Sequence, residues 1–205
     1  HQHKELDQEL NSKHSHEAME KWMLDMVAIA NVADMVPLKG EARTLTKYGL
    51  VVLNKTKRIG LKKLFLEAGI MEDDGTLKNE VNSGTIGFQI APRINAAGRL
   101  NHANVAYKLM TTDSGVEATD LAYELNQNNR NRKKIVKDCL EEAKTQLEEQ
   151  KNNPVLFVKD KDWKTGIVGL IASKIKEEFH KPVIAMAKNG DGEITGSGRS
   201  IKGFN

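Results

Sequence analysis

The residues best suited to chemistry lie in a short stretch, A-P-R-I-N-A-A-G-R-L, at positions 91–100. Arg93 and Arg99 each offer planar, forked donors that suit a phosphate, and Asn95 adds an amide between them. The small residues around them allow a backbone to approach a ligand closely. Pro92 disfavours helix at Ala91, so we expect the stretch to begin as a loop and to run into a helix. These residues alone fit either an anion-binding segment or a loop with solvated arginines.

Two glycine-containing segments nearer the C-terminal end carry similar chemistry. The first, W-K-T-G-I-V-G at 163–169, places Lys164 and Gly166 where a loop enters a predicted helix. Exposed N–H groups at the start of a helix favour an anion. The second, G-S-G-R-S at 196–200, joins flexible backbone, hydroxyls and a guanidinium in Ser197, Gly198, Arg199 and Ser200. Both segments are also compatible with plain turns.

A carboxylate, Asp34, stands near the expected end of a helix that Pro37 terminates. There it opposes the helix dipole, so it usually needs a compensating arginine or metal ion. The alternative is a surface aspartate paired with Lys39 or Arg43.

Four of the six histidines fall within the first sixteen residues, at positions 1, 3, 14 and 16. Imidazoles are common metal ligands, but no carboxylate or cysteine constellation accompanies these. A hydrated helix or a frayed terminus is the simpler interpretation.

The composition excludes several classes of protein. The chain has 205 residues, 39% of them hydrophobic, which is enough for one large domain or two small ones. Its net charge is only +3, so any nucleic-acid surface must come from local clusters. The single cysteine, Cys139, excludes a disulfide framework and a cysteine zinc site. Without an apolar run that spans a bilayer or a secretory signal, a soluble cytoplasmic protein is expected.

The first half of the chain is expected to be helical. Hydrophobic spacing predicts helices over 18–33, 41–54, 61–68 and 103–110, and leaves 79–90 undecided between helix and strand. A longer helix should run from Gly115 to about Gln150. Within it, residues 126–134 include no apolar side chain. A segment that is polar all round should not dock in a core, so we interpret it as a bridge between domains, and its basic cluster as a solvated face or a contact with nucleic acid.

Beyond Pro154 the pattern changes to short strands around a helix. Strands are predicted over 155–158, 182–187 and 193–200, with a helix over 167–179. Strand–helix–strand spacing favours a parallel crossover. The predicted fold class is therefore α/β: a mostly helical first half, a long connecting helix, and a small α/β domain with a short, mainly parallel sheet. The predicted domain bounds are 1–114, 115–152 and 153–205.

Taken in order, these motifs resemble the bacterial RecJ family of single-strand-specific 5′-to-3′ DNA exonucleases, in the DHH phosphoesterase superfamily. The resemblance runs from about Met23 to the C-terminus and rests on segments 33–41, 91–100, 163–174 and 196–200. It implies that 1–114 is the C-terminal part of a DHH domain and that 153–205 is most of the DHH-associated domain. One position departs from the pattern: Lys164 stands where family members commonly carry a histidine. A lysine can neutralise a phosphate but cannot accept a hydrogen bond.

The resemblance also implies a site. The family holds two divalent ions, Mn²⁺ or Mg²⁺, and the last metal-binding aspartate falls on Asp34; the other ligands, including the Asp-His-His, would precede residue 1. It implies that Arg93, Asn95 and Arg99 face the DNA backbone near the scissile phosphate, and that the segment around Arg199 holds further phosphates. The candidate catalytic and metal residue is thus Asp34, and the candidate DNA-binding residues are Arg93, Asn95, Arg99, Lys164, Gly166, Ser197, Gly198, Arg199 and Ser200.

The implied function is two-metal hydrolysis of single-stranded DNA in DNA repair and recombination. Single-strand-binding protein and a recombination helicase are the implied protein partners. We expect this chain alone to be inactive, because one aspartate cannot hold two metal ions. The alternatives are a phosphodiesterase for oligonucleotides or cyclic dinucleotides, and a non-catalytic scaffold that binds nucleic acid.

Overall fold

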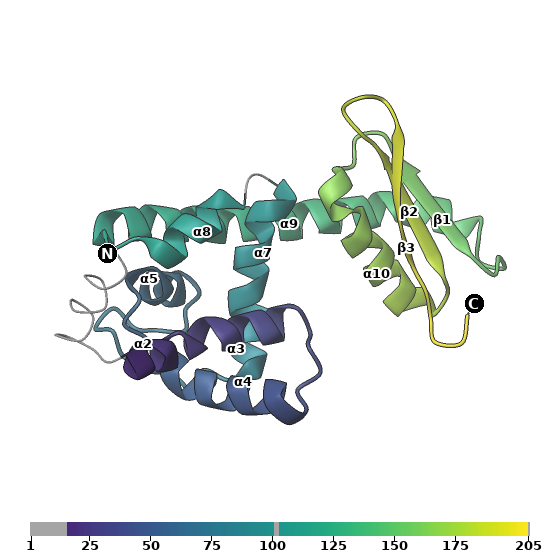
Figure 1. Cartoon of the computed structure of the whole chain (residues 1–205). Coiled ribbons are helices and arrows are strands. Elements are labelled where there is room, and N and C mark those ends of the chain that lie inside the picture. Colours follow the sequence, from purple (N-terminus) through teal and green to yellow (C-terminus); the bar gives the residue numbers. More distant parts are fainter. Residues whose placement is uncertain (1–15, 101–102, 205) are drawn as a thin grey trace, which may run out of the picture. The chain divides into compact units, whose positions relative to one another are not determined.

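The structure, a computed structural model, describes residues 16–100 and 103–204 (Figure 1). These residues form two compact units. The first holds 16–95 and 103–126, and the second holds 96–100 and 127–204. The histidines at positions 1, 3 and 14 lie outside the described residues. Within the described ranges, no helix is both long and apolar enough to cross a membrane.

The first unit is built from helices, as predicted. The helix predicted over 18–33 is interrupted at Met23, and the undecided stretch 79–90 contains a short α-helix followed by a π-helix. The elements are α2 (His16–Trp22), α3 (Leu24–Ala33), α4 (Gly40–Leu53), α5 (Ile59–Glu67), α6 (Ser83–Thr85), η1 (Ile86–Ile90), α7 (Ala91–Leu100), α8 (Asn104–Thr111) and the start of α9 (Gly115–Glu148).

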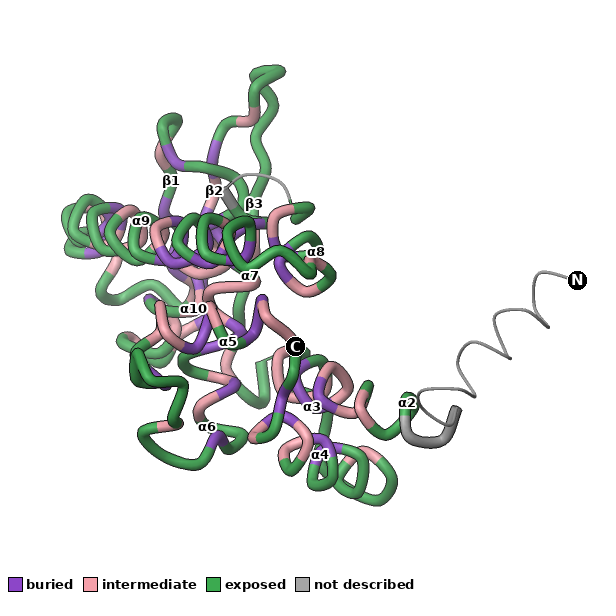
Figure 2. Tube along the Cα trace, turned by 90° about the vertical axis from the view of Figure 1, so that its left-hand side faces the viewer, coloured by how far each residue is buried: buried purple, intermediate pink, exposed green. Residues whose placement is uncertain are grey.

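Buried residues of the first unit lie along its helices (Figure 2). Its core is mainly aliphatic, and its helices approach closely at two glycines. A Cβ on Gly49 of α4 would lie 2.2 Å from the Leu24 carbonyl oxygen of α3. A Cβ on Gly60 of α5 would lie 1.7 Å from the Leu109 carbonyl oxygen of α8. Only glycine permits such approaches of backbone to backbone. Fully buried side chains of this core include Leu53, Leu61, Leu64, Phe65, Ile86, Ile90, Leu109 and Leu125.

The stretch 91–100 does not begin as a loop, contrary to the sequence prediction. It is α7, and it continues directly from the π-helix η1. The Ala91 N–H donates to the Ile86 carbonyl, five residues back. Pro92 has no N–H, and its ring crowds the preceding turn of a regular helix. A widened π-type turn immediately before it accommodates the ring, so the helix passes through the proline.

The sequence predicted that the polar run 126–134 would not dock in a core, and the structure differs from this prediction. It lies inside α9, and three of its asparagines are buried: Asn126, Asn128 and Asn129. For Asn126 and Asn129, burial is tolerated because their side chains have hydrogen-bond partners. Asn126 joins Arg93 to Glu67, and Asn129 accepts a hydrogen bond from Arg132.

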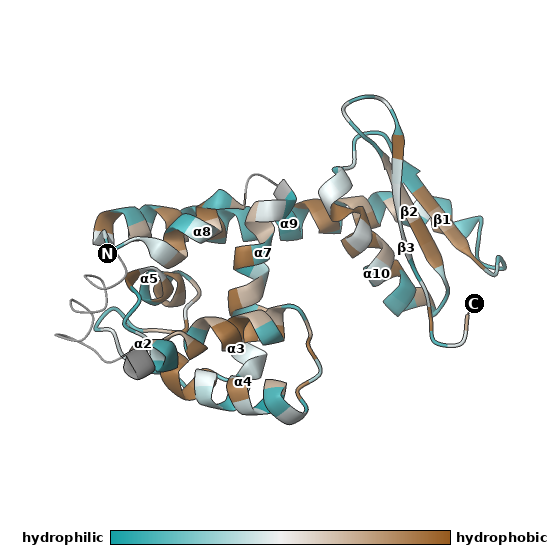
Figure 3. Ribbon diagram, in the orientation of Figure 1, coloured by the Kyte–Doolittle hydropathy of each residue, from teal (hydrophilic) through white to brown (hydrophobic). Residues whose placement is uncertain are grey.

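The second unit is a two-layer α/β structure, which confirms the predicted fold class. Its sheet has the order β1-β2-β3, formed by Leu156–Asp160, Val183–Lys188 and Ile194–Arg199. β1 pairs with β2 in parallel through η2 (Thr165–Ile167) and α10 (Val168–Phe179), and β2 pairs with β3 antiparallel. β1 and β2 are the more hydrophobic strands (Figure 3). Their buried residues pack with α10 and the second half of α9, as the shared core of Cys139, Ala143, Leu147, Leu156, Val158, Ile171, Ile175, Val183 and Ala185 shows.

Gln146 of α9 and Gln150, in the turn just after that helix, satisfy the free edge of β1. Gln150 donates to the Phe157 carbonyl at 2.7 Å and accepts from the Phe157 N–H at 2.9 Å. Gln146 pairs in the same way with Lys159, at 3.0 Å in each direction. Residues four apart on a helix face the same side, as do residues two apart on a strand. The glutamines therefore occupy the edge donors and acceptors that would otherwise be open to another strand.

Candidate phosphate-binding site

Most of the candidate phosphate-binding residues lie in the second unit, around the start of α10. Gly169 is in the first turn of this helix, and a Cβ there would lie 3.0 Å from Arg199 Nη2 and 3.2 Å from Ser197 Oγ. Because Gly169 has no side chain, the Arg199 guanidinium and the Ser197 hydroxyl can lie against the start of the helix. Backbone N–H groups, a hydroxyl and a guanidinium together are a suitable set of donors for a phosphate.

Arg199 is held in place by its own strand. Its Nη1 donates to Ser197 Oγ at 2.9 Å and to the Gly198 carbonyl at 2.7 Å. Arg199 and Ser200 are exposed, and Ser197 is half-buried. Among the described residues, no carboxylate forms an ion pair with Arg199. The guanidinium is therefore oriented by neutral acceptors and keeps its charge available to an anion.

A second contact in this unit joins Arg99 to the loop before α10. Arg99 is exposed, and its Nη1 donates to the Gly166 carbonyl at 3.3 Å. A Cβ on Gly166 would lie 2.4 Å from the Arg99 carbonyl oxygen, so this position requires glycine. Trp163 anchors the same loop: it is buried, and its Nε1 donates to Glu142 Oε2 of α9 at 2.9 Å. Lys164, between the anchor and the glycine, is exposed.

Arg132 of α9 is a residue that sequence reasoning missed, because it lies in a basic run interpreted mainly as a solvated face. It is half-buried, and its Nη2 donates to Asn129 Oδ1 at 2.9 Å. Burial lowers the pKa of the Arg132 guanidinium from its ordinary value, and the positive charge of Arg99 lowers it further. The asparagine three residues before it on the same helix is the sequence signal that could have identified it.

In the first unit, Arg93 is fixed by a chain of polar contacts. Its Nε donates to Asn126 Oδ1 at 3.0 Å, and its Nη1 donates to the Gln89 carbonyl at 2.6 Å. Asn126 is buried, and its Nδ2 donates to Glu67 Oε2 at 2.8 Å. Asn95, one helical turn before Arg99, is exposed. Arg93 is thus oriented by the buried Asn126 and by the Gln89 carbonyl, while Asn95 is open to solvent.

Asp34 is the C-cap of α3, so it lies near the end of a helix, as expected from the sequence. The following residue, Met35, has a left-handed backbone with φ of 56°. Asp34 is exposed, and the described residues contain no group of three or more His, Cys, Asp or Glu side chains placed to hold a metal ion.

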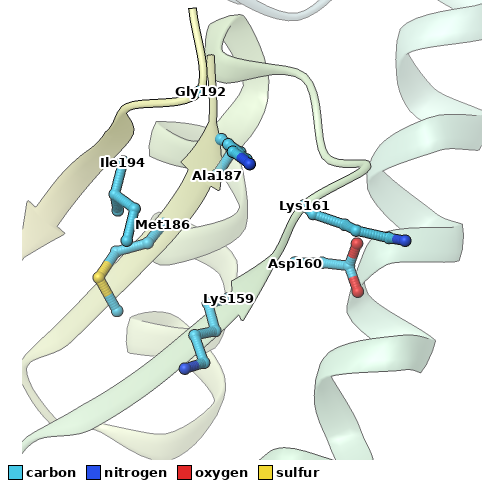
Figure 4. Close-up of a pocket in the computed structure, with 8 residues that line it drawn as sticks. Lys159, Asp160, Lys161, Met186, Ala187, Gly192 and Ile194 are labelled. Atoms are coloured by element: carbon cyan, nitrogen blue, oxygen red, sulfur yellow. The ribbon is translucent and has the colours of Figure 1, made fainter. Parts of the chain in front are cut away.

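One pocket does not coincide with any of these residues. It has a volume of about 560 Å³ and lies on the outer face of the sheet in the second unit (Figure 4). Its lining combines lysines with apolar side chains, including Lys159, Lys161, Met186, Lys188 and Ile194. The donor-rich residues at the start of α10 are a better match to a phosphate than this lining is.

Comparison with known proteins finds a matching family model and several relatives. The DHHA1 domain family matches residues 152–205. The single-stranded-DNA-specific exonuclease RecJ of Bacillus subtilis is 40% identical over 185 residues, which cover 89% of this chain and 23% of that protein. The crystal structure of RecJ from Thermus thermophilus in complex with Mg²⁺ superposes with a TM-score of 0.75 at 31% identity, over 88% of this chain and 27% of that one.

A crystal structure of an exonuclease RecJ bound to manganese gives a TM-score of 0.72 at 30% identity, over 89% of this chain and 43% of that one. The chain spans about a quarter to under half of the length of these proteins. Over most of its residues, this chain is therefore similar in sequence and in structure to a part of the RecJ exonucleases.

Proposed function

We propose that this chain is part of a RecJ-type exonuclease that hydrolyses single-stranded DNA from the 5′ end, and that it supplies residues that bind the phosphates of the strand. The observation that carries the proposal is the arrangement at the start of α10. There Gly169 brings Arg199 and Ser197 against the helix N-terminus, with no carboxylate of the described residues paired to the arginine. The RecJ proteins similar to this chain support the same substrate class.

The chemistry proposed for the intact protein is metal-assisted hydrolysis. Two divalent ions, Mn²⁺ or Mg²⁺, would supply the hydroxide and stabilise charge on the phosphate. Support for these metals comes from RecJ structures that contain them. Asp34 would be one ligand, and the others would come from outside this chain. The residues present here bind and orient: Arg93 and Arg99 would neutralise backbone phosphates, and Arg199 a further phosphate of the strand.

Binding of labelled oligothymidylate to this chain tests the proposal. We expect the single strand to bind more tightly than a duplex of equal length, and affinity to fall as salt rises because phosphate contacts release counterions. Arg199→Gln should weaken binding about tenfold, since a charge-assisted hydrogen bond contributes about 1.5–3 kcal/mol. Arg130→Gln, an equal charge change at an exposed site on α9, is the matched control.

Equal losses in the two variants, or equal affinity for single strand and duplex, would overturn the proposed role. We also expect no nucleotide release by this chain alone. Manganese-dependent release that Asp34→Ala abolishes would show instead that the chain contains a complete metal centre.

A further inference from the structure

We propose that Arg132 is a further phosphate-binding residue, and that with Arg99 it forms an anion subsite in the second unit for a phosphodiester of the single strand. The subsite is built from α9, the C-terminal end of α7 and the Gly166 loop. This inference rests on the proposed function, because the strand supplies the phosphate. It extends that function to a residue in a run of basic side chains that the sequence alone does not distinguish from a solvated face.

The first support is the incomplete hydrogen bonding of Arg132. Its Nη2 donates to Asn129, which is 2% exposed and so positions the guanidinium from within the fold. Its Nε is buried and has no hydrogen-bond partner among the described residues. A buried donor that lacks an acceptor costs about 1–3 kcal/mol. Asn129 fixes the guanidinium from within the fold, so the exposed part of this half-buried side chain is oriented in advance for an acceptor on the solvent side.

The second support is uncompensated positive charge. Arg99 lies near enough to Arg132 to lower its pKa, and no carboxylate of the described residues forms an ion pair with either arginine. The partly buried Arg58 of the first unit shows the contrast, because its Nε lies 2.9 Å from Asp25 Oδ2. Two neighbouring guanidiniums without a carboxylate repel each other, and an anion that accepts from both would remove the repulsion.

The third support is access. Arg99 is exposed, and the close approach of Gly166 to the Arg99 backbone holds the end of α7 against the loop. The hydrogen bond from Arg99 Nη1 to the Gly166 carbonyl occupies part of one guanidinium fork. The remaining donors of Arg99 are available to a phosphate oxygen on the solvent side. Exposed Lys164 and Lys133 add positive charge on the loop and on the helix.

The test compares Arg132→Gln with Arg130→Gln in this chain. Both variants remove one positive charge from the same helix, but only Arg132 is half-buried and bonded to Asn129. We expect Arg132→Gln to weaken oligothymidylate binding about tenfold and to lower the slope of log K against log salt by about 0.7, the value for one lost phosphate contact on a single strand. Arg130→Gln should change affinity less than about twofold. Equal losses in affinity and slope would overturn the inference.

Inorganic phosphate identifies the source of the anion. If phosphate alone raises the melting temperature of the wild-type chain and of Arg130→Gln but not of Arg132→Gln, the subsite also takes free phosphate. If the oligonucleotide, but not inorganic phosphate, produces this pattern of melting temperatures, the subsite is specific to the strand. No difference between the two variants with either probe would overturn the subsite. Failure of the wild-type chain to bind oligothymidylate at all would overturn the proposed function, whereas normal binding by Arg132→Gln would overturn only this inference.

A second variant keeps the test decisive if Arg132→Gln does not fold, as circular dichroism would show. Arg132→Lys keeps the charge and a long side chain but removes the planar fork. It should bind oligothymidylate with an affinity between those of the wild-type chain and Arg99→Gln. If Arg132→Lys and Arg99→Gln both bind oligothymidylate with wild-type affinity, the anion subsite formed by the two arginines is overturned.

Discussion

Asn126 shows how a buried polar residue can orient a candidate binding residue, Arg93. An asparagine amide can donate and accept at once, and Asn126 uses both abilities, toward Glu67 and Arg93. Through Asn126, the Glu67 carboxylate and the Arg93 guanidinium belong to one chain of hydrogen bonds. A buried amide that bonds to both groups fixes the direction of the Arg93 side chain.

The buried thiol of Cys139 predicts a measurable dependence of stability on pH. Burial raises its pKa to about 11 from the ordinary 9.0, and the carboxylates of Glu142 and Asp138 add to the effect. Since the unfolded chain loses this proton first, the thiol's contribution to the free energy of unfolding is complete below about pH 9 and is lost as pH rises through about 11. The loss should reach roughly 2 kcal/mol, because one pKa unit corresponds to about 1.4 kcal/mol.

Urea unfolding at about pH 8 and about pH 11 measures this effect. Cys139→Ala is the control, because it lacks the titrating group while other groups titrate as before. The wild-type chain should lose more stability than Cys139→Ala over this interval. The same loss in both proteins would show that the thiol titrates alike in the folded and unfolded chains.

At the scale of the elements, the crossing of α5 and α8 depends on Gly60. A Cβ at this position would lie 1.7 Å from the Leu109 carbonyl oxygen, and backbone cannot move aside as a flexible side chain can. We expect Gly60→Ala to lower the free energy of unfolding by about 3 kcal/mol through overpacking. The control is Gly115→Ala at the start of α9, where nothing lies within 4 Å of the added Cβ.

Gly115→Ala should be neutral or stabilising by up to about 1 kcal/mol, because alanine has the higher helix propensity. Chemical denaturation of the two variants measures the difference. A loss in Gly60→Ala no larger than about 1 kcal/mol would mean that α5 and α8 separate at little cost.

The elements also show which features the sequence could predict. Hydrophobic spacing predicted α4, α5, α8 and α10, because in each of them one face meets a core. It also predicted the parallel pairing of β1 with β2. It could not predict a helix through Pro92, because the π-type turn that permits it depends on packing around Ile86 and Ile90. Nor could it predict the burial of Asn126, because its partners, Glu67 and Arg93, are remote in sequence.

At the scale of the whole chain, the candidate binding residues are distributed over two units. Arg99 comes before the long helix in sequence, yet it groups with the residues that follow that helix. Its contact with Gly166 spans 67 positions, a separation that local patterns do not encode. The sequence predicted that both residues bind the DNA backbone, through their resemblance to known motifs. It did not predict Arg132, because packing, which half-buries this residue, distinguishes it from the exposed Arg130 and Lys133 beside it.

The two units have separate cores, and this predicts separate responses to core substitutions. Leu64 is fully buried in the first unit and Ile171 in the second, so replacing either by alanine should cost its own unit about 2–5 kcal/mol. The chain has two tryptophans, and they report on different units: Trp22 lies in the first, and Trp163 is buried in the second. In a Trp22→Phe background, fluorescence therefore follows the second unit alone.

We expect Ile171→Ala to lower the urea midpoint of Trp163 fluorescence and Leu64→Ala to leave it nearly unchanged. The reason lies in α9, which is continuous from Gly115 to Glu148 but contributes separate residues to the two cores. Loss of the first core removes the support of the helix as far as Leu125, while Cys139, Ala143 and Leu147 still pack against the sheet. An equal shift from Leu64→Ala would contradict separate unfolding and show that α9 couples the two cores into one cooperative transition.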